Sequence, residues 1–342
     1  MDYVELRKEV TEKGLLDRQY GYYTFKILSS LAMVCGFGFL FLTTSNFWLQ
    51  LALVFGLTVG VLQFTFLGHD AGHKAIFKSD RWNNFFGHIF FELFGGVGYN
   101  YWVIRHNKHH ASPNHEDEDP DMIFVQSEGM MARKKGIGLF LAKRQHWLYF
   151  PALSLYAIVF QVRSTVHNLK LKNSFEKWAE LSLLLSYLGV FWVLPFFFMA
   201  WWKAILFVPI LRVLEGLYFG SVSATNHKGM RVVKKGEQLD FVDKQVLTTR
   251  NLRSSPWIDF VYGGLNYQIE HHLFPTMPRN NFKKVKMLII DFCRQANLPY
   301  EETGVIKSYR IILGELRRIA LSAKRSKASA PAANPLLSRS AN

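Results

Sequence analysis

Cysteine is almost absent from this chain, which has only Cys35 and Cys293 among its 342 residues. Cys35 lies in a long apolar run and Cys293 in the C-terminal region. Two isolated cysteines supply neither a disulfide framework nor a thiolate metal site. The sequence therefore predicts a reducing compartment, and any metal must be bound by nitrogen or oxygen.

Charged residues are scarce in four long stretches. At about 1.5 Å per residue, each stretch can cross a hydrocarbon core of about 30 Å. The last contains Arg212 and Glu215, and such a pair should face protein or a water-filled cavity rather than lipid. The predicted spans are about 27–45, 47–68, 179–201 and 204–224.

A cleavable signal peptide is also missing from this pattern. Residues 1–26 carry both signs of charge before the first apolar run, and no small-residue cleavage pattern follows it. We expect this N-terminal segment to be retained.

Acidic residues are outnumbered, with 26 Asp and Glu against 41 Lys and Arg, a formal net charge of +15. The connector near Thr43–Phe47 has no Lys or Arg, and the one near Trp202 has only Lys203. Cytoplasmic loops are enriched in Lys and Arg, so both termini and the long middle loop should be cytoplasmic. No nucleic-acid-binding module is visible, so the charge suits anionic lipid head groups or an acidic substrate head group such as coenzyme A.

Two shorter apolar stretches, 85–102 and 147–162, are interrupted by polar residues, glycines or proline. If only one crossed the membrane, histidine clusters on either side of it could not share a site. We therefore expect both to be re-entrant or interfacial. The loop 69–178 and the tail 225–342 should form a helical cap, with helices at 282–296 and 304–323.

The last residues, 324–342, are basic and of low complexity, and we expect them to be disordered. The predicted organisation is thus a cytoplasmic segment 1–26, a membrane domain 27–323 and this tail.

Three histidine clusters have helical spacing. They read 69-HDAGH-73, 106-HNKHH-110 and 268-QIEHH-272. Residues three and four apart share one helical face, so each cluster should direct its side chains to one side. The candidate ligands are His69, His73, His106, His109, His110, His271 and His272, with Gln268 at the first position of the third cluster.

This set predicts a metal centre rather than packed histidines. Imidazole-rich sites suit iron, copper, nickel or zinc, and seven histidines exceed the needs of one tetrahedral zinc but suit two ions. His88, His115 and His146 do not fit the spacing, and we expect them to be packed or exposed.

The three clusters, with 112-SPNHEDEDPD-121 and 266-NYQIEHHLFP-275, resemble the histidine boxes of membrane fatty acid desaturases, in the branch whose third box begins with glutamine. The resemblance covers about residues 20 to 320. It implies an all-α integral membrane protein, with four transmembrane helices in two hairpins under a helical cytoplasmic cap that holds a di-iron site.

The resemblance also adds residues to the site. The family has a further histidine just after the fourth span, which places His227 of 225-TNHKGM-230 among the ligands. Stearoyl-CoA relatives have an asparagine four residues before it, where this chain has Ser223, so Asn226 is the candidate for a supporting role. Asp70 and Glu270 could orient ligating imidazoles, or be exposed or cap helices, and the acidic run 116–121 could be a capping loop or have an orienting role.

By this resemblance, the chain is a fatty acyl desaturase that uses O2 and two electrons at two iron ions to introduce a cis double bond. The substrate would be a fatty acyl-CoA or acyl lipid in the bacterial inner membrane or an endoplasmic-reticulum-type membrane. No His-Pro-Gly-Gly haem motif is present, so a separate ferredoxin, cytochrome or flavin reductase should supply electrons. The glutamine-led box favours a bond between an existing double bond and the carboxyl group.

Two alternatives stay open from the sequence. A hydroxylase or related di-iron oxygenase could use the same site, and its product would be a hydroxy acid. A membrane metal transporter or sensor is the non-enzyme alternative, but its ligands should lie within the spans rather than just beyond them.

Overall fold

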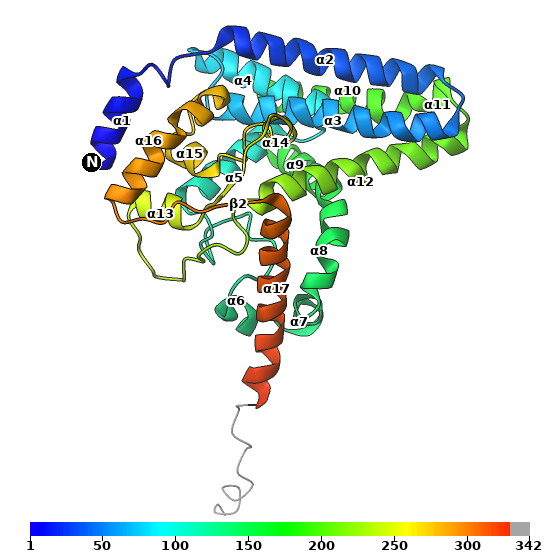
Figure 1. Ribbon diagram of the computed structural model, residues 1–342. Helices are drawn as coiled ribbons and strands as arrows, with labels where there is room; N and C mark the ends of the chain where they lie inside the picture. Colours follow the sequence, from blue (N-terminus) through cyan, green and yellow to red (C-terminus); the bar gives the residue numbers. More distant parts are fainter. Residues whose placement is uncertain (329–342) are drawn as a thin grey trace, which may run out of the picture.

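The computed structural model describes residues 1–328, and within them it is helical almost throughout (Figure 1). Four helical segments are long and apolar enough to cross a membrane, in agreement with the four predicted spans, and the chain is an integral membrane protein. They are α2 (Tyr20–Thr43), α3 (Phe47–Gly72), the segment Phe175–Phe198 and α12 (Trp201–Thr225).

These helices extend past the apolar runs on the side of the cap. α2 begins at Tyr20 and α3 continues to Gly72, because a helix gains one backbone hydrogen bond per added residue whether or not the side chain is apolar. The extension carries polar residues out of the apolar zone and into contact with the cap. The first histidine cluster lies in this part of α3.

The spans form two hairpins that lie side by side in Figure 1. The first joins α2 to α3 through a short turn, where the Asn46 side chain accepts a hydrogen bond from the Leu49 N–H at 3.0 Å and caps α3. α3 is largely buried between α2 and α12, whereas α2 is mostly exposed.

The third span is three consecutive pieces, a π-helical turn separating two α-helices. Pro195 follows this turn directly, where its missing N–H is tolerated at a helix start. The pieces are α10 (Phe175–Leu188), η2 (Gly189–Val193) and α11 (Pro195–Phe198).

Arg212 and Glu215 of α12 pair with each other inside the protein, with only 1% and 3% of their surfaces exposed. Arg212 also donates to the Tyr187 hydroxyl of α10 at 2.7 Å. The expectation that this pair faces protein rather than lipid is confirmed.

The two shorter apolar stretches are broken into separate helices. Neither is among the four candidate spans found in residues 1–328, as expected. The first stretch overlaps α4 (Asp80–His88), the π-helix η1 (Ile89–Phe94) and α5 (Tyr99–Ala111). The second overlaps α8 (Gln145–Ser154) and α9 (Tyr156–Lys170).

The remaining elements form the cap at one end of the spans (Figure 1). α17 extends away from it beside α8, and a two-stranded parallel sheet pairs Asn251 with Glu302 and Leu252 with Thr303. The elements are α1 (Tyr3–Glu12), α6 (Glu128–Ala132), α7 (Gly136–Ala142), α13 (Phe241–Leu247), β1 (Asn251–Leu252), α14 (Pro256–Val261), α15 (Gln268–Leu273), η3 (Arg279–Asn281), α16 (Phe282–Gln295), β2 (Glu302–Thr303) and α17 (Val305–Ala328).

α16 and α17 match the two helices predicted for the tail. The apolar stripe of α16 packs against α1 and α15 in a buried cluster that includes Val285, Ile289 and Phe292. α17 continues to Ala328, past the predicted end at residue 323. The segment 324–342 was predicted to be disordered, and its residues 329–342 lie outside the described part of the chain.

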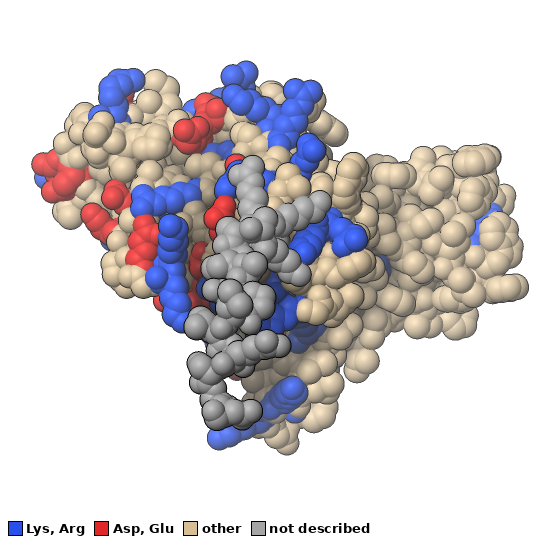
Figure 2. Space-filling model, turned by 90° about the horizontal axis from the view of Figure 1, so that it is seen from below, with Lys and Arg blue, Asp and Glu red and all other residues tan. Residues whose placement is uncertain are grey.

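Charge is unevenly distributed over the surface. On the face shown in Figure 2, Lys, Arg, Asp and Glu gather over the cap, while the part formed by the long helices shows few charged groups. An apolar belt beside a charged cap is the surface expected of a protein whose spans face lipid.

Candidate metal centre

The first histidine pair lies at the cap end of α3. His69 is in the last turn and His73 directly follows the helix, so the i, i+4 spacing puts both rings on one face, with centroids 4.7 Å apart. Both side chains are buried.

α5 carries the second cluster opposite this pair. The His106 Nε2 atom lies 3.1 Å from His69 Nε2 and 2.9 Å from His73 Nε2. His110, one turn later, places its Nε2 3.1 Å from that of His106.

The short helix α15 carries the third cluster. Neighbouring residues on a helix point about 100° apart, and the adjacent His271 and His272 accordingly point to different places. The His271 Nε2 lies 3.1 Å from that of His110, whereas the His272 ring lies 4.8 Å from the His227 ring.

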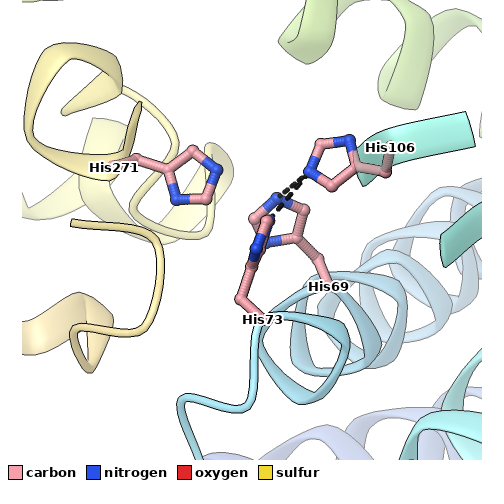
Figure 3. A group of neighbouring side chains, drawn as sticks. All are labelled: His69, His73, His106 and His271. Carbon is pink, nitrogen blue, oxygen red and sulfur yellow. Dashed lines mark hydrogen bonds between the residues drawn. The ribbon is translucent and has the colours of Figure 1, made fainter. Parts of the chain in front are cut away.

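Two groups of histidines result. In the first group, four candidate ligand atoms lie within 4.8 Å of one another, and Figure 3 shows the rings from α3, α5 and α15 converging on one region. In the second group, three candidate ligand atoms also lie within 4.8 Å of one another. The first group is His69, His73, His106 and His271, and the second is His109, His227 and His272.

His110 lies between the two groups. Its ring stacks on that of His272 at a centroid distance of 4.2 Å, while its Nε2 faces His106 and His271 of the first group. All eight predicted histidines are therefore brought together.

Hydrogen bonding shows which ring nitrogen faces the site. For four histidines, Nδ1 lies against an oxygen that can only accept, so Nδ1 carries the proton and Nε2 directs a lone pair inward, as metal ligation requires. The pairs are His69 with Asp70 (3.4 Å), His109 with Asp119 (3.0 and 3.1 Å), His227 with the Thr248 carbonyl (3.2 Å) and His272 with Gln245 Oε1 (2.8 Å).

The inward nitrogens lie close together, and one of them has no partner. His109 Nε2 and His227 Nε2 are 3.2 Å apart, and His272 Nε2 is buried without a hydrogen-bond partner. A buried acceptor without a partner is costly. Cations among these nitrogens would remove this penalty, so the residues present fit two metal ions.

Burial keeps most of these imidazoles neutral. It lowers the pKa well below the ordinary value for His73, His106, His110, His227, His271 and His272. His109 differs: burial lowers its pKa, but the Asp119 carboxylate outweighs this effect and raises the pKa above the usual range. In turn, although burial opposes ionisation, His109 lowers the pKa of Asp119 to about 2.

Gln268 lies at the second histidine group. Its Oε1 accepts a hydrogen bond from Asn226 Nδ2 at 3.0 Å, and Asn226 Nδ2 also donates to the Leu265 carbonyl. Because this second bond fixes the Asn226 amide, the Gln268 amide nitrogen is the atom that faces His227 Nε2, at 2.9 Å.

Asp70 and Glu270 differ in what they contact. Asp70 lies beside His69 Nδ1 and accepts from the Tyr23 hydroxyl at 2.8 Å and from the buried Arg279 guanidinium. Glu270 points away from the histidines and accepts from Asn251 Nδ2 at 2.7 Å and the Tyr300 hydroxyl at 2.5 Å.

The possibility that Glu270 orients an imidazole does not match this geometry. On α15 it lies on the face opposite Gln268, His271 and His272. It instead fastens α15 to β1 and to the segment before β2.

A glycine pair allows the third cluster to reach α3. Gly263 and Gly264 have φ values of +57° and +84°, which favour glycine, and a Cβ on Gly263 would lie 2.5 Å from the Phe66 ring. Any larger residue would push the loop before α15 away from α3.

The histidines predicted to be outside the centre are outside it. His115 Nδ1 accepts from the backbone N–H groups of Asp117 and Glu118, His146 lies beside Trp147, and His88 contacts Glu92.

Sequence reasoning missed several supporting residues. Gln245, Thr248, Tyr23 and Arg279 lie far along the chain from the groups they hold, and no local pattern marks them. Asp119 was within the acidic run 116–121, and its place next to the second cluster was the available signal.

An apolar cavity opens beside the histidines. Its walls include Trp102, Tyr156, Phe160 and Phe219, along with His69, His106, His109 and His227. The same four aromatic residues also line a second, almost wholly apolar cavity that reaches Val61, Leu62 and Thr65 of α3. The two cavities thus share aromatic walls between the histidine centre and α3.

Comparisons with known proteins agree with this site. The family model described as "Fatty acid desaturase" matches residues 45–304, a range that contains every candidate ligand. The chain is 31% identical over 329 residues to human "Fatty acid desaturase 3", covering 93% of this chain and 72% of the relative.

Two further relatives come from a plant and a nematode. The chain is 28% identical over 343 residues to the "Acyl-lipid (9-3)-desaturase" of Borago officinalis, covering 94% of this chain and 75% of the relative. It is 29% identical over 336 residues to the "Delta(6)-fatty-acid desaturase fat-3" of Caenorhabditis elegans, covering 92% and 74%. The chain therefore belongs to the membrane fatty acid desaturase family and is an O2-dependent oxidoreductase.

Proposed function

We propose that this desaturase introduces a cis double bond into the acyl chain of a fatty acyl-CoA or acyl lipid, at a centre of two iron ions. The observation that carries the proposal is the two groups of inward-facing imidazoles at the wall of a mainly apolar cavity. Bound iron would supply the oxidising power that an alkyl C–H bond requires and that no side-chain acid or base has.

Each histidine group would hold one ion. His69, His73, His106 and His271 would bind the first, and His109, His227 and His272 the second. His110 faces the first group more closely, because its Nε2 lies 3.1 Å from the Nε2 atoms of both His106 and His271.

Gln268 would support the second ion through a water or substrate oxygen. Its side-chain oxygen is already engaged by Asn226, so direct ligation would require the amide to turn over and lose that bond. Its amide nitrogen faces the group and can donate a hydrogen bond there. Asn226, held by the Leu265 carbonyl, is then the residue that orients Gln268.

The protein's own contribution to the reaction is position and exclusion of water. An acyl chain would lie beside the histidines in the first cavity and extend toward Thr65 in the second, past the aromatic residues that line both. Rigid aromatic walls would hold one pair of methylenes next to the centre, since near-attack geometry decides which carbons react. The walls also keep bulk water from the oxidising site.

The remaining parts of the proposal concern partners and orientation. Two electrons would come from a separate ferredoxin, cytochrome or flavin reductase. Both termini and the centre would face the cytoplasm of a bacterial inner membrane or an endoplasmic-reticulum-type membrane, because Lys and Arg concentrate on the cap.

Expression in a host that lacks unsaturated fatty acids tests the reaction, with gas chromatography of the fatty acid methyl esters. We expect a new double bond, its loss in His271→Ala, and its retention in His115→Ala, a histidine outside the centre. A hydroxy acid as the product would refute the desaturase assignment.

Feeding the same host one saturated acid and one acid with an existing double bond tests the position. The glutamine-led box and the names of the relatives favour insertion between an existing double bond and the carboxyl group. Conversion of the saturated acid alone would refute this part of the proposal.

A further inference from the structure

A second cluster of possible metal ligands lies near the start of α5, apart from the histidine centre. His88 of α4, Glu92 of η1 and Glu180 of α10 bring candidate ligand atoms within 4.8 Å of one another. Both glutamates are completely buried, whereas the His88 side chain is 23% exposed. None of the three belongs to either histidine group.

The donor atoms have the spacing of ligands around one ion. His88 Nδ1 lies 3.2 Å from each Glu92 carboxylate oxygen and 3.5 Å from Glu180 Oε1. Two donors at about 2.0–2.2 Å from a shared ion, at tetrahedral or octahedral angles, lie about 3.0–3.5 Å from each other.

The cluster lacks positive charge. Among residues 1–328, neither Glu92 nor Glu180 has a Lys or Arg nitrogen within salt-bridge distance, and His88 is the one basic side chain that pairs with them. The first turn of α5 offsets part of the charge, since the Tyr99 N–H donates to Glu92 at 2.7 Å and the Asn100 N–H to Glu180 at 3.1 Å. Two carboxylates buried beside one imidazole are costly to ionise without a further cation.

Further polar atoms at this place have no partner. Glu180 Oε2 and both amide atoms of Asn168 are buried without a hydrogen bond, and Asn168 is 0% exposed. They converge at Gly98, where an added Cβ would lie 3.0 Å from Asn168 Nδ2 and 3.5 Å from Glu180 Oε2. Buried oxygen atoms without a partner beside an imidazole are what a bound cation would complete.

We propose that His88, Glu92 and Glu180 bind a divalent transition-metal ion, with Asn168 as a neighbouring oxygen donor. One imidazole and two carboxylates suit Mn²⁺ or Zn²⁺. The ion joins four elements, α4, η1, α9 and α10, at the start of the helix that carries His106. It holds α5 in place relative to the spans, and the exposed edge of His88 gives it a path from solvent.

Mn²⁺ uptake by the iron-loaded, full-length protein in detergent tests the proposal, measured by metal analysis and by electron paramagnetic resonance. Loading iron first fills the histidine groups, so the Mn²⁺ signal reports a different place. We expect about one further ion per chain. Iron occupies the same donors if it is in excess, so it is supplied at about two ions per chain and the total metal is counted. A total of no more than about two metal ions per chain after Mn²⁺ or Zn²⁺ is added overturns the proposal, whatever becomes of the desaturase activity.

Three variants locate the ion. His88→Gln and Glu180→Gln should each lower the affinity for Mn²⁺ by at least about tenfold, with the iron content unchanged. Glu176→Gln is the matched control, because it removes an exposed carboxylate one turn earlier on α10 and should leave Mn²⁺ uptake as it is. Undiminished uptake in both test variants overturns the proposal.

The Glu180 carboxylate also holds α5, so Glu180→Gln could fail to fold. In that case anomalous X-ray scattering at the manganese edge from the wild-type protein decides the matter. Density between His88, Glu92 and Glu180 supports the proposal, and density elsewhere refutes it.

Discussion

Asp119→Asn is the substitution whose effect the structure specifies most fully. The buried Asp119 carboxylate accepts from His109 Nδ1 with both oxygens, at 3.0 and 3.1 Å. Each oxygen also accepts one backbone N–H at 2.8 Å, from Asn114 or from Asp121. All these partners are donors, so an amide NH2 at either position faces another donor.

The expected damage follows from this arrangement. Turned either way, the amide loses one backbone hydrogen bond and weakens the hold on the His109 Nδ1 proton. Losing that hold frees the ring to adopt the other tautomer, in which Nε2 carries the proton and cannot bind a metal. Removing such a partner costs about 10- to 100-fold in metal affinity or activity, which corresponds to about 1.4–2.7 kcal/mol.

Iron content and desaturation in the expression host measure this effect. Asp117→Asn is the control, since the Asp117 side chain pairs with Arg133 and Lys235 at the surface and with none of the clustered histidines. We expect the Asp119→Asn protein to fold but to bind iron more weakly and to make less product. Wild-type iron content and product yield in this variant would refute the assignment of His109 as a ligand held by Asp119.

The pH dependence of stability gives an independent test of the interactions that hold the Asp119 carboxylate ionised. The pKa of Asp119 is about 2 in the folded chain against an ordinary 3.8, a lowering that stabilises the fold by about 2 kcal/mol where the carboxylate is ionised in both states. This contribution is present above about pH 4 and is lost as the pH falls toward 2. Asp119→Asn should therefore lower stability at neutral pH and make it less dependent on pH between 4 and 2.

Three further predictions follow from the same contacts. Gln268→Ala should strongly impair desaturation, and Gln268→His should retain metal while losing or changing the rate; near wild-type turnover of the alanine variant would show that Gln268 is only a spacer. Arg279→Leu leaves the Asp70 carboxylate buried without its charged partner and should destabilise the protein by about 3–5 kcal/mol, measured as a lower unfolding temperature. Arg294→Leu, which changes an exposed arginine of α16, is the control. Removing the metal with a chelator should also lower the unfolding temperature, because a bound ion stabilises the folded state and His272 Nε2 is buried without a hydrogen-bond partner in its absence. A temperature that does not change would contradict the two-ion site.

The spans and the ligand positions could be predicted because their signals are local. A run of apolar residues of sufficient length is favourable in a bilayer wherever the rest of the chain lies. Likewise, the i, i+4 spacing of His69 and His73 fixes both rings on one helical face. Helix ends were less predictable: α2 begins at Tyr20 and α17 reaches Ala328, because backbone hydrogen bonding continues after the apolar pattern stops.

Supporting contacts were beyond prediction for a different reason. Arg279 reaches Asp70 and Gln245 reaches His272 only after α3, α13, α15 and η3 have packed together. Each pair satisfies a buried polar group, but many residues of the chain could supply the same hydrogen bond. Glu270, inside a predicted box, points the other way because its place on α15 is opposite the ligands.

The sequence by itself determined that the chain has four stretches long and apolar enough to cross a membrane and that histidines at helical spacing lie at their ends or beyond them, since hydropathy and helix periodicity act over neighbouring residues. The tertiary structure decided how those histidines are divided. His271 joins His69, and the adjacent His272 joins His109 and His227, because one step along a helix turns a side chain by about 100° and the partners come from distant segments. It also decided which nitrogen of each ring faces inward, through oxygen atoms that packing alone brings near.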